Sequence, residues 1–116
     1  MATGICVGNA LEAADLLAAE GVSAEVINIC TIKPLDEELI VNSAKKTGKV
    51  VTAEEHSVIG GLGSAVCDAL CKSYPVPVLK IGMQDTFGES GSAAALVEKY
   101  KLDGKGIAEQ IRDFLR

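Results

Sequence analysis

VVTAEEHSVIGGLGS, residues 50–64, runs from a short apolar strand through a glycine-rich loop into the start of a helix. Its first four residues are short and rich in valine, which favours a strand of a parallel sheet that is covered on both faces. The glycines permit a tight turn. A helical spacing of apolar residues begins near Gly63 or Ser64 and continues to Tyr74, where Pro75 stops it. This order of strand, loop and helix is the repeating unit of α/β proteins.

Two more β-branched runs extend the pattern in both directions along the chain. Residues 24–29 (AEVINI) precede it and residues 78–81 (VLKI) follow it, so we predict three strands together with residues 50–53. Longer helical segments separate these runs. A chain of 116 residues has room for one core of ordinary size, and we therefore expect one α/β domain over residues 1–116.

The segments between and after the strands carry helical spacing and helix-end signals. One predicted helix ends at Gly21, and the next has Asp36 as its N-cap and ends at Gly48. Two more helices are expected after Ser92 and after Asp103. The expected inward faces are Val7, Ala10, Leu11, Ala14, Leu17 and Ala18 on the first helix, Leu62, Val66, Ala69 and Leu70 on the third, and Ile107, Ile111, Phe114 and Leu115 on the last.

The start of the chain has an unusual form for such a domain. Residues 1–4 (MATG) look like the last residues of a strand that enters the first helix, so we expect this first strand to be mostly absent. A sheet that lacks a strand presents backbone N–H and C=O groups at an open edge. We expect such a domain to associate with itself or to accept a strand from elsewhere.

Composition excludes several classes of partner and location. The net charge of −5 and the lack of any Lys/Arg cluster argue against nucleic acid and anionic membranes as partners. No stretch approaches the roughly 20 apolar residues of a membrane span, and a cytoplasmic location is the default expectation. We interpret the four cysteines as reduced thiols, with Cys67 and Cys71 packed in the core.

The glycine-rich loop is the first candidate site, because small residues at a helix start let an anion approach free backbone N–H groups. The residues concerned are Gly60, Gly61, Gly63 and Ser64. The dinucleotide fingerprint fails, since Val66 stands where the third glycine belongs. A tight turn that packs helix against strand is therefore favoured over a cofactor site, and a free-standing regulatory module that binds an anion or small ligand remains an alternative.

The polar residues before and after this loop give two further candidates. His56 beside Glu54 and Glu55 has the chemistry of a general base, but no G-x-S-x-G motif accompanies it, so an interface or structural role is favoured. Residues 82–92 form a long polar loop that contains Asp85 and Phe87. Loops of this length commonly act as contact surfaces, and the alternative is that Phe87 simply anchors the loop in the core.

The same segments resemble a known family. The runs TIKPLD (31–36), TAEEHSVIGGLGSAV (52–66) and DTFGESG (85–91) resemble the C-terminal domain of transketolase, and the likeness continues through residues 96–102. It is closest to prokaryotic forms that are encoded as two polypeptides. The resemblance implies a three-layer α/β/α domain with a mostly parallel five-stranded sheet, one strand of which is antiparallel. Related domains end deoxyxylulose-phosphate synthase and the beta subunits of 2-oxoacid dehydrogenases, and these are the alternatives within the enzyme class.

The resemblance also implies what the chain does and what it does not bind. In this family thiamine diphosphate and its Mg²⁺ are held by the other domains, as are the groups that bind sugar phosphates. No catalytic, cofactor-binding or metal-binding residue therefore carries over to this chain, which we expect to be inactive alone. The implied role is a non-catalytic assembly domain, partnered with the thiamine-diphosphate-binding N-terminal half, in a homodimeric enzyme that transfers two-carbon ketol units.

Overall fold

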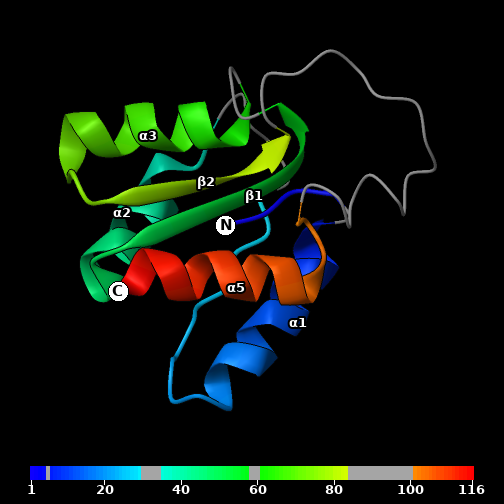
Figure 1. The fold of residues 1–116 in the computed structure, drawn as a ribbon. Coiled ribbons are helices and arrows are strands. Elements are labelled where there is room, and N and C mark those ends of the chain that lie inside the picture. The colour runs from blue at the N-terminus through cyan, green and yellow to red at the C-terminus, as the bar shows by residue number, and fades with distance from the viewer. Residues whose placement is uncertain (5, 30–34, 58–60, 84–100) are drawn as a thin grey trace.

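The computed structural model describes residues 1–4, 6–29, 35–57, 61–83 and 101–116, with residues 55–57 and 83 described by their backbone alone (Figure 1). The elements in chain order are α1 (Cys6–Ala18), α2 (Glu37–Thr47), β1 (Val50–Ser57), α3 (Leu62–Ser73), β2 (Val78–Met83) and α5 (Gly104–Leu115). The four helices confirm the predictions for these segments. The helix expected after Ser92 lies outside the described residues.

The sheet is parallel throughout its described part. Strand β1 pairs with β2 in register from Val50 opposite Val78 to Ala53 opposite Ile81. On the other side of β1, Ala2 forms one parallel bridge to Ala53 and another to Asn28. The spatial order is therefore residues 27–29, residues 1–3, β1 and β2, which places the chain start inside the sheet (Figure 1).

Backbone hydrogen bonds hold the chain start on both sides. The Ala2 N–H donates to the Ile27 carbonyl at 2.9 Å, and the Ile29 N–H donates to the Ala2 carbonyl at 2.9 Å. Toward β1, the Ala53 N–H donates to the Met1 carbonyl at 2.9 Å, and the Met1 ammonium donates to the Val51 carbonyl at 2.8 Å. Residues 1–3 therefore lie between residues 27–29 and β1, as the end of an inner strand of the sheet would.

One prediction about the sheet is corrected in the described part of the chain. Residues 24–29 form only the bridge at Asn28 and no extended strand. The described part of the sheet has two strands plus these bridged segments, all parallel, and the expected five strands with one antiparallel stay a prediction. Residues 24–26 extend past the segment 1–3, which pairs only with residues 27–29. No described strand therefore lies beside residues 24–26 to form a ladder with them.

Helices cover both faces of the sheet and make three layers, with α1 and α5 on one face and α2 and α3 on the other (Figure 1). Strand residues alternate between the two faces. Ala53 and Ile81 join the α1/α5 core, whereas Val50 joins the α2/α3 core. The buried side chains of the first core are Ala2, Cys6, Ala13, Leu17, Ala53, Ile81, Leu102, Ile107 and Ala108, and those of the second are Ile27, Ile29, Ile40, Ala44, Val50, Leu62, Val66 and Leu70.

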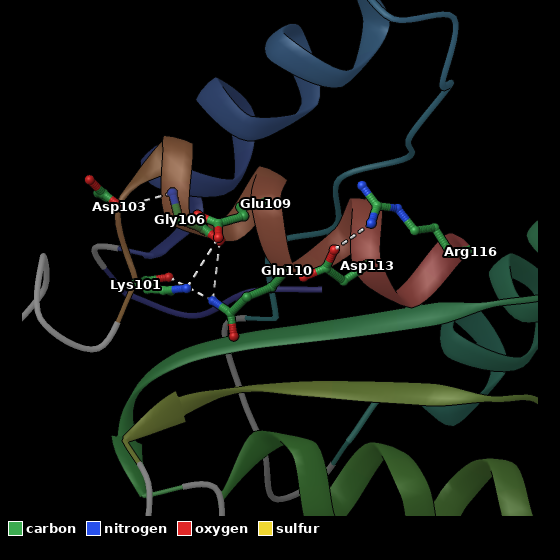
Figure 2. A network of polar contacts seen from close by, with 7 residues as sticks. All are labelled: Lys101, Asp103, Gly106, Glu109, Gln110, Asp113 and Arg116. Atoms are coloured by element: carbon green, nitrogen blue, oxygen red, sulfur yellow. Dashed lines mark hydrogen bonds and ion pairs between the residues drawn. The ribbon is translucent and has the colours of Figure 1, made fainter.

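Polar contacts fix the start of α5 and join α5 to α1. The Asp103 carboxylate accepts a hydrogen bond from the Gly106 N–H at 2.9 Å, as an N-cap does, and the Gln110 side chain donates to the Lys101 carbonyl at 2.9 Å (Figure 2). Lys101 has a positive φ of 57° at the turn that precedes the helix. At the other end, Arg112 of α5 pairs with Glu20, which follows α1, at 2.7 Å.

Helix α2 confirms the end signals, since the Asp36 side chain accepts from the Leu39 N–H at 3.1 Å and Gly48 adopts a left-handed conformation. The predicted face of α1 is partly wrong, because Leu11 is 52% exposed. This helix packs on both the sheet and α5, so its buried face is centred on Cys6, Ala13 and Leu17.

The cysteine predictions have a mixed outcome. Cys67 and Cys71 carry free thiols, whereas Cys30 lies outside the described residues. Cys6 is buried and Cys67 is half-buried, but Cys71 is exposed, which corrects its predicted place in the core. The buried face of α3 consists of Leu62, Gly63, Val66, Ala69 and Leu70. Cys71 follows that face by one residue and points away from it.

The buried chain start predicts a pH dependence of stability. Burial lowers the pKa of the Met1 ammonium from 8.0 to about 6. Between these values the unfolded state binds more protons than the folded state, so the free energy of unfolding rises from pH 6 to pH 8, by on the order of 1–3 kcal/mol. Urea titrations across this range measure the effect. An N-acetylated chain keeps the N–H donor without the charge, and persistence of the same slope after acetylation would contradict the assignment to Met1.

Candidate functional site

The centre of the glycine-rich segment is a buried carboxylate. Glu54 lies on β1 with only 2% of its surface exposed. Its Oε1 accepts a hydrogen bond from the Leu62 N–H at 3.0 Å, and its Oε2 accepts one from the Gly63 N–H at 2.9 Å. Both donors belong to the first turn of α3. The side chain of one element therefore caps the N-terminus of the next.

The sequence requires this cap because α3 lacks one of its own. The N-cap position is Gly61, which has no side chain to accept a hydrogen bond from the first turn. The carboxylate of Glu54 supplies both acceptors and places its negative charge at the positive end of the helix dipole. A charge buried this deeply is stable only when hydrogen bonds compensate its lost hydration.

Two glycines make the close approach of β1 and α3 possible. A Cβ built on Gly61 would collide with the Glu54 carboxylate. A Cβ on Gly63 would lie 2.8 Å from Cγ of Lys80 and 2.9 Å from Oγ1 of Thr52. This crowding accounts for glycine at both positions and agrees with the interpretation of the loop as a tight turn between strand and helix.

In the described part of this loop, the helix N–H groups that could bind an anion are already occupied. The N–H groups of Leu62 and Gly63 already bind Glu54, and the carboxylate brings a negative charge to the place where a phosphate would lie. The described residues of the loop therefore do not fit the diphosphate of thiamine diphosphate. Among the described residues, no three His, Cys, Asp or Glu side chains cluster as a metal site requires.

The other predicted site residues divide between described and undescribed segments. Ser64 lies half-buried in the first turn of α3, next to the Glu54 cap. Glu55 and His56 are placed only as backbone positions of β1. The remaining candidates, Gly60, Asp85 and Phe87, lie outside the described residues. The structure thus brings together Glu54, Gly61, Gly63 and Ser64.

Sequence reasoning missed the direct link between Glu54 and α3, and it missed Thr52 and Lys80 as neighbours of Gly63. No local signal marks this link, because the helix start predicted near Gly63 or Ser64 has a serine as a possible N-cap. The Thr52 hydroxyl is buried and has no hydrogen-bond partner in the described part of the chain.

Across residues 1–4, 6–29, 35–57, 61–83 and 101–116, none of the helices has the length and apolar character that crossing a bilayer demands.

Replacing the buried carboxylate with an amide tests the cap. In Glu54→Gln, one of the two helix N–H groups faces an NH₂ group in place of an acceptor, so we expect the free energy of unfolding to fall by on the order of 2–4 kcal/mol. The control Asp15→Asn makes the same chemical change on an exposed position of α1 and should stay within about 0.5 kcal/mol. Equal effects of the two variants in urea titration would show that the cap contributes nothing.

Two alanine substitutions with opposite expected signs test the close packing. Gly61→Ala places a methyl group against the Glu54 carboxylate and should lower the free energy of unfolding by roughly 1–3 kcal/mol. Gly8→Ala lies in α1 with open space around its Cβ and should raise it by about 0.5–1 kcal/mol, because glycine destabilises a helix interior. A stabilising Gly61→Ala would refute the crowded geometry.

Comparison with known proteins now places this arrangement in a family. Residues 1–107 match the profile of the family described as transketolase, C-terminal domain. A solved structure described as a split gene transketolase, inactive beta4 tetramer, is 53% identical with a TM-score of 0.91, over 97% of this chain and 37% of that chain. The α/β fold class predicted from the sequence is therefore confirmed.

Curated relatives give the same result. The 6-deoxy-6-sulfo-D-fructose transketolase subunit SqwH of Clostridium sp. strain MSTE9 is 53% identical over 107 residues, which are 92% of this chain and 33% of that protein. A putative transketolase C-terminal section of Methanocaldococcus jannaschii is 44% identical, over 100% of this chain and 36% of that protein. A 1-deoxy-D-xylulose-5-phosphate synthase of Heliobacterium modesticaldum is 44% identical over 97% of this chain but only 18% of its own length.

The chain thus spans about a third of the length of the transketolase relatives that it matches. The match covers β1, the Glu54 cap and α3 together, and it extends from the first residue into α5. The chain belongs to the transketolase C-terminal domain family.

Proposed function

We propose that this chain is the non-catalytic assembly part of a thiamine-diphosphate-dependent transketolase. The observation that carries the proposal is the Glu54 cap. The Glu54 carboxylate occupies the N–H groups at the start of α3 that could otherwise bind the phosphate of a cofactor. In this proposal thiamine diphosphate and Mg²⁺ bind to the other half of the enzyme. The chain contributes a rigid domain on which that half is assembled.

The partner in this proposal is the thiamine-diphosphate-binding N-terminal half, carried on a separate polypeptide. Support comes from the names of the relatives, which describe a subunit, a C-terminal section and a split gene product. The reaction of the assembled enzyme would be transfer of a two-carbon ketol unit between sugar phosphates. A homodimer of the assembled enzyme and a cytoplasmic location stay predictions, and the solved relative is itself described as a tetramer.

A second candidate is favoured by one comparison. The 44% identity to 1-deoxy-D-xylulose-5-phosphate synthase extends over 97% of this chain, so the domain could equally complete a synthase of that class. The two functions differ in the substrates that the assembled enzyme uses. A transketolase moves a ketol unit between sugar phosphates, whereas the synthase condenses pyruvate with glyceraldehyde phosphate.

Calorimetric titration and reconstitution test the proposal together. The chain titrated with thiamine diphosphate and Mg²⁺ should give no saturable heat at micromolar cofactor, and it should have no ketol-transfer activity alone. Mixing it with its cognate thiamine-binding half should produce that activity, with the half alone as control. Saturable binding by the isolated chain would contradict the assembly role, and turnover of pyruvate with glyceraldehyde phosphate by the mixture would favour the synthase.

A further inference from the structure

Two thiols lie on one stripe of α3, beyond the turn that Glu54 caps. Cys67 is half-buried and Cys71 is exposed, and both are free. They stand four positions apart within the helix Leu62–Ser73, so their side chains lie one above the other on the same face. A helical side chain leans toward the N-terminus of its helix, which brings the Cys71 sulfur back toward Cys67. Solvent reaches both side chains, so the pair has an open entry path.

The helix sets a spacing at which these two sulfurs do not bond to each other. Residues at i and i+4 have Cβ atoms about 5–6 Å apart, whereas a disulfide needs about 3.5–4.5 Å. An intact α3 therefore keeps the two thiols from forming a disulfide with each other. An atom inserted between the sulfurs replaces one S–S bond with two longer bonds. The wider span that results suits the helix without a change in its backbone.

The number and kind of ligands decide which atom fits between the sulfurs. Thiolates are soft ligands that favour Cu(I), Zn²⁺ and iron–sulfur clusters. Structural zinc sites and these clusters are held by four protein ligands. Within the part of the chain that the structure describes, no group of three His, Cys, Asp or Glu side chains forms a metal site, so no third ligand of this kind joins the pair. Cu(I) fits such a site, because it accepts two thiolates as its complete ligand set.

The surroundings of the pair leave the two sulfurs accessible to an ion. Lys72, the residue after Cys71, turns toward α2, where its ammonium pairs with Glu37 at 3.2 Å. The buried side of α3 is occupied by its apolar residues and lies beside the stripe that carries the two thiols. Cys6 offers no comparable site, because it is 0% exposed and belongs to the α1/α5 core.

We propose that Cys67 and Cys71 form a surface site for Cu(I), held by two thiolates of one helix. Binding breaks two S–H bonds, forms two S–Cu bonds and releases two protons to solvent, so Cu⁺ and two thiols give an anionic complex without any change of oxidation state. The ion links two successive turns of α3 and should stabilise them, because it binds the folded helix and not the unfolded chain in this geometry. The site shares no residue with the Glu54 cap, and it goes beyond the proposed assembly role.

Two chains of identical composition test the site. The double variant Cys71→Ser/Ser73→Cys exchanges two side chains, and Ser73 is the exposed last residue of α3. Its two thiols on α3 then lie on different sides of the helix, while Cys6 and Cys30 are unchanged. We expect the reduced natural sequence, titrated with Cu(I) against a colorimetric Cu(I) chelator without oxygen, to bind about 100-fold more tightly than the variant, because the second thiolate binds intramolecularly.

The position of the bound ion is a separate readout. Cu(I) is diamagnetic, so NMR spectra of the chain with ¹³C-labelled cysteine can be followed through the titration. The Cβ signals of Cys67 and Cys71 should shift together and reach their end point at one equivalent of Cu(I). Circular dichroism of the two metal-free chains should agree, which separates loss of the site from loss of the helix.

Several outcomes would overturn this proposal. Equal affinity of the two chains, or shifts at other cysteines with none at Cys67, would place the ion elsewhere. Native mass spectrometry that finds copper only in dimers would assign it to thiols of two copies. If the exchanged chain does not fold, Cys71→Ser alone should lose the tight binding, and retention of that binding would also refute the site. These measurements need neither thiamine diphosphate nor a partner chain, so their failure leaves the proposed function unaffected.

Discussion

The hydrogen bonds from the first turn of α3 to the Glu54 carboxylate are the constraint on which the middle of the fold depends. They join the end of β1 to the start of α3 over a loop of few residues. Because the carboxylate is buried, no other side chain can replace it without leaving donors unsatisfied. The glycines at 61 and 63 follow from this approach, since any side chain there would meet Glu54, Thr52 or Lys80. The motif that resembles a ligand-binding loop is thus explained by internal packing.

The sequence located the described helices and the strands β1 and β2, but it overpredicted a strand at residues 24–29 and did not show which elements pack together. Periodicity and end signals located α2 with its Asp36 cap and Gly48 end, because these signals act within a few residues. The buried face of α1 depends on how α1 lies between the sheet and α5, and Leu11 was misplaced for that reason. The Glu54 cap was missed because hydrogen bonding between residues eight positions apart in the chain is not visible as a local pattern.

Similarity over nearly the whole chain establishes the family, but both the transketolase relatives and the synthases contain a segment that matches this chain. The domain is therefore compatible with more than one reaction, because the chemistry belongs to the site and not to the fold. The described residues favour a structural contribution, since their one buried carboxylate is consumed by a helix cap.

The pairing of α1 with α5 determines the order in which the two faces of the domain become complete during synthesis. On one face, α2, β1, α3 and β2 all lie between residues 37 and 83, so these elements meet soon after they leave the ribosome. On the other face, Asn9 of α1 donates to the Leu102 carbonyl, 93 positions later in the chain. The apolar side of α1 consequently stays uncovered until α5 emerges. Contacts between such distant segments also slow folding, so we expect this surface to stay exposed in the nascent chain after the other face has formed.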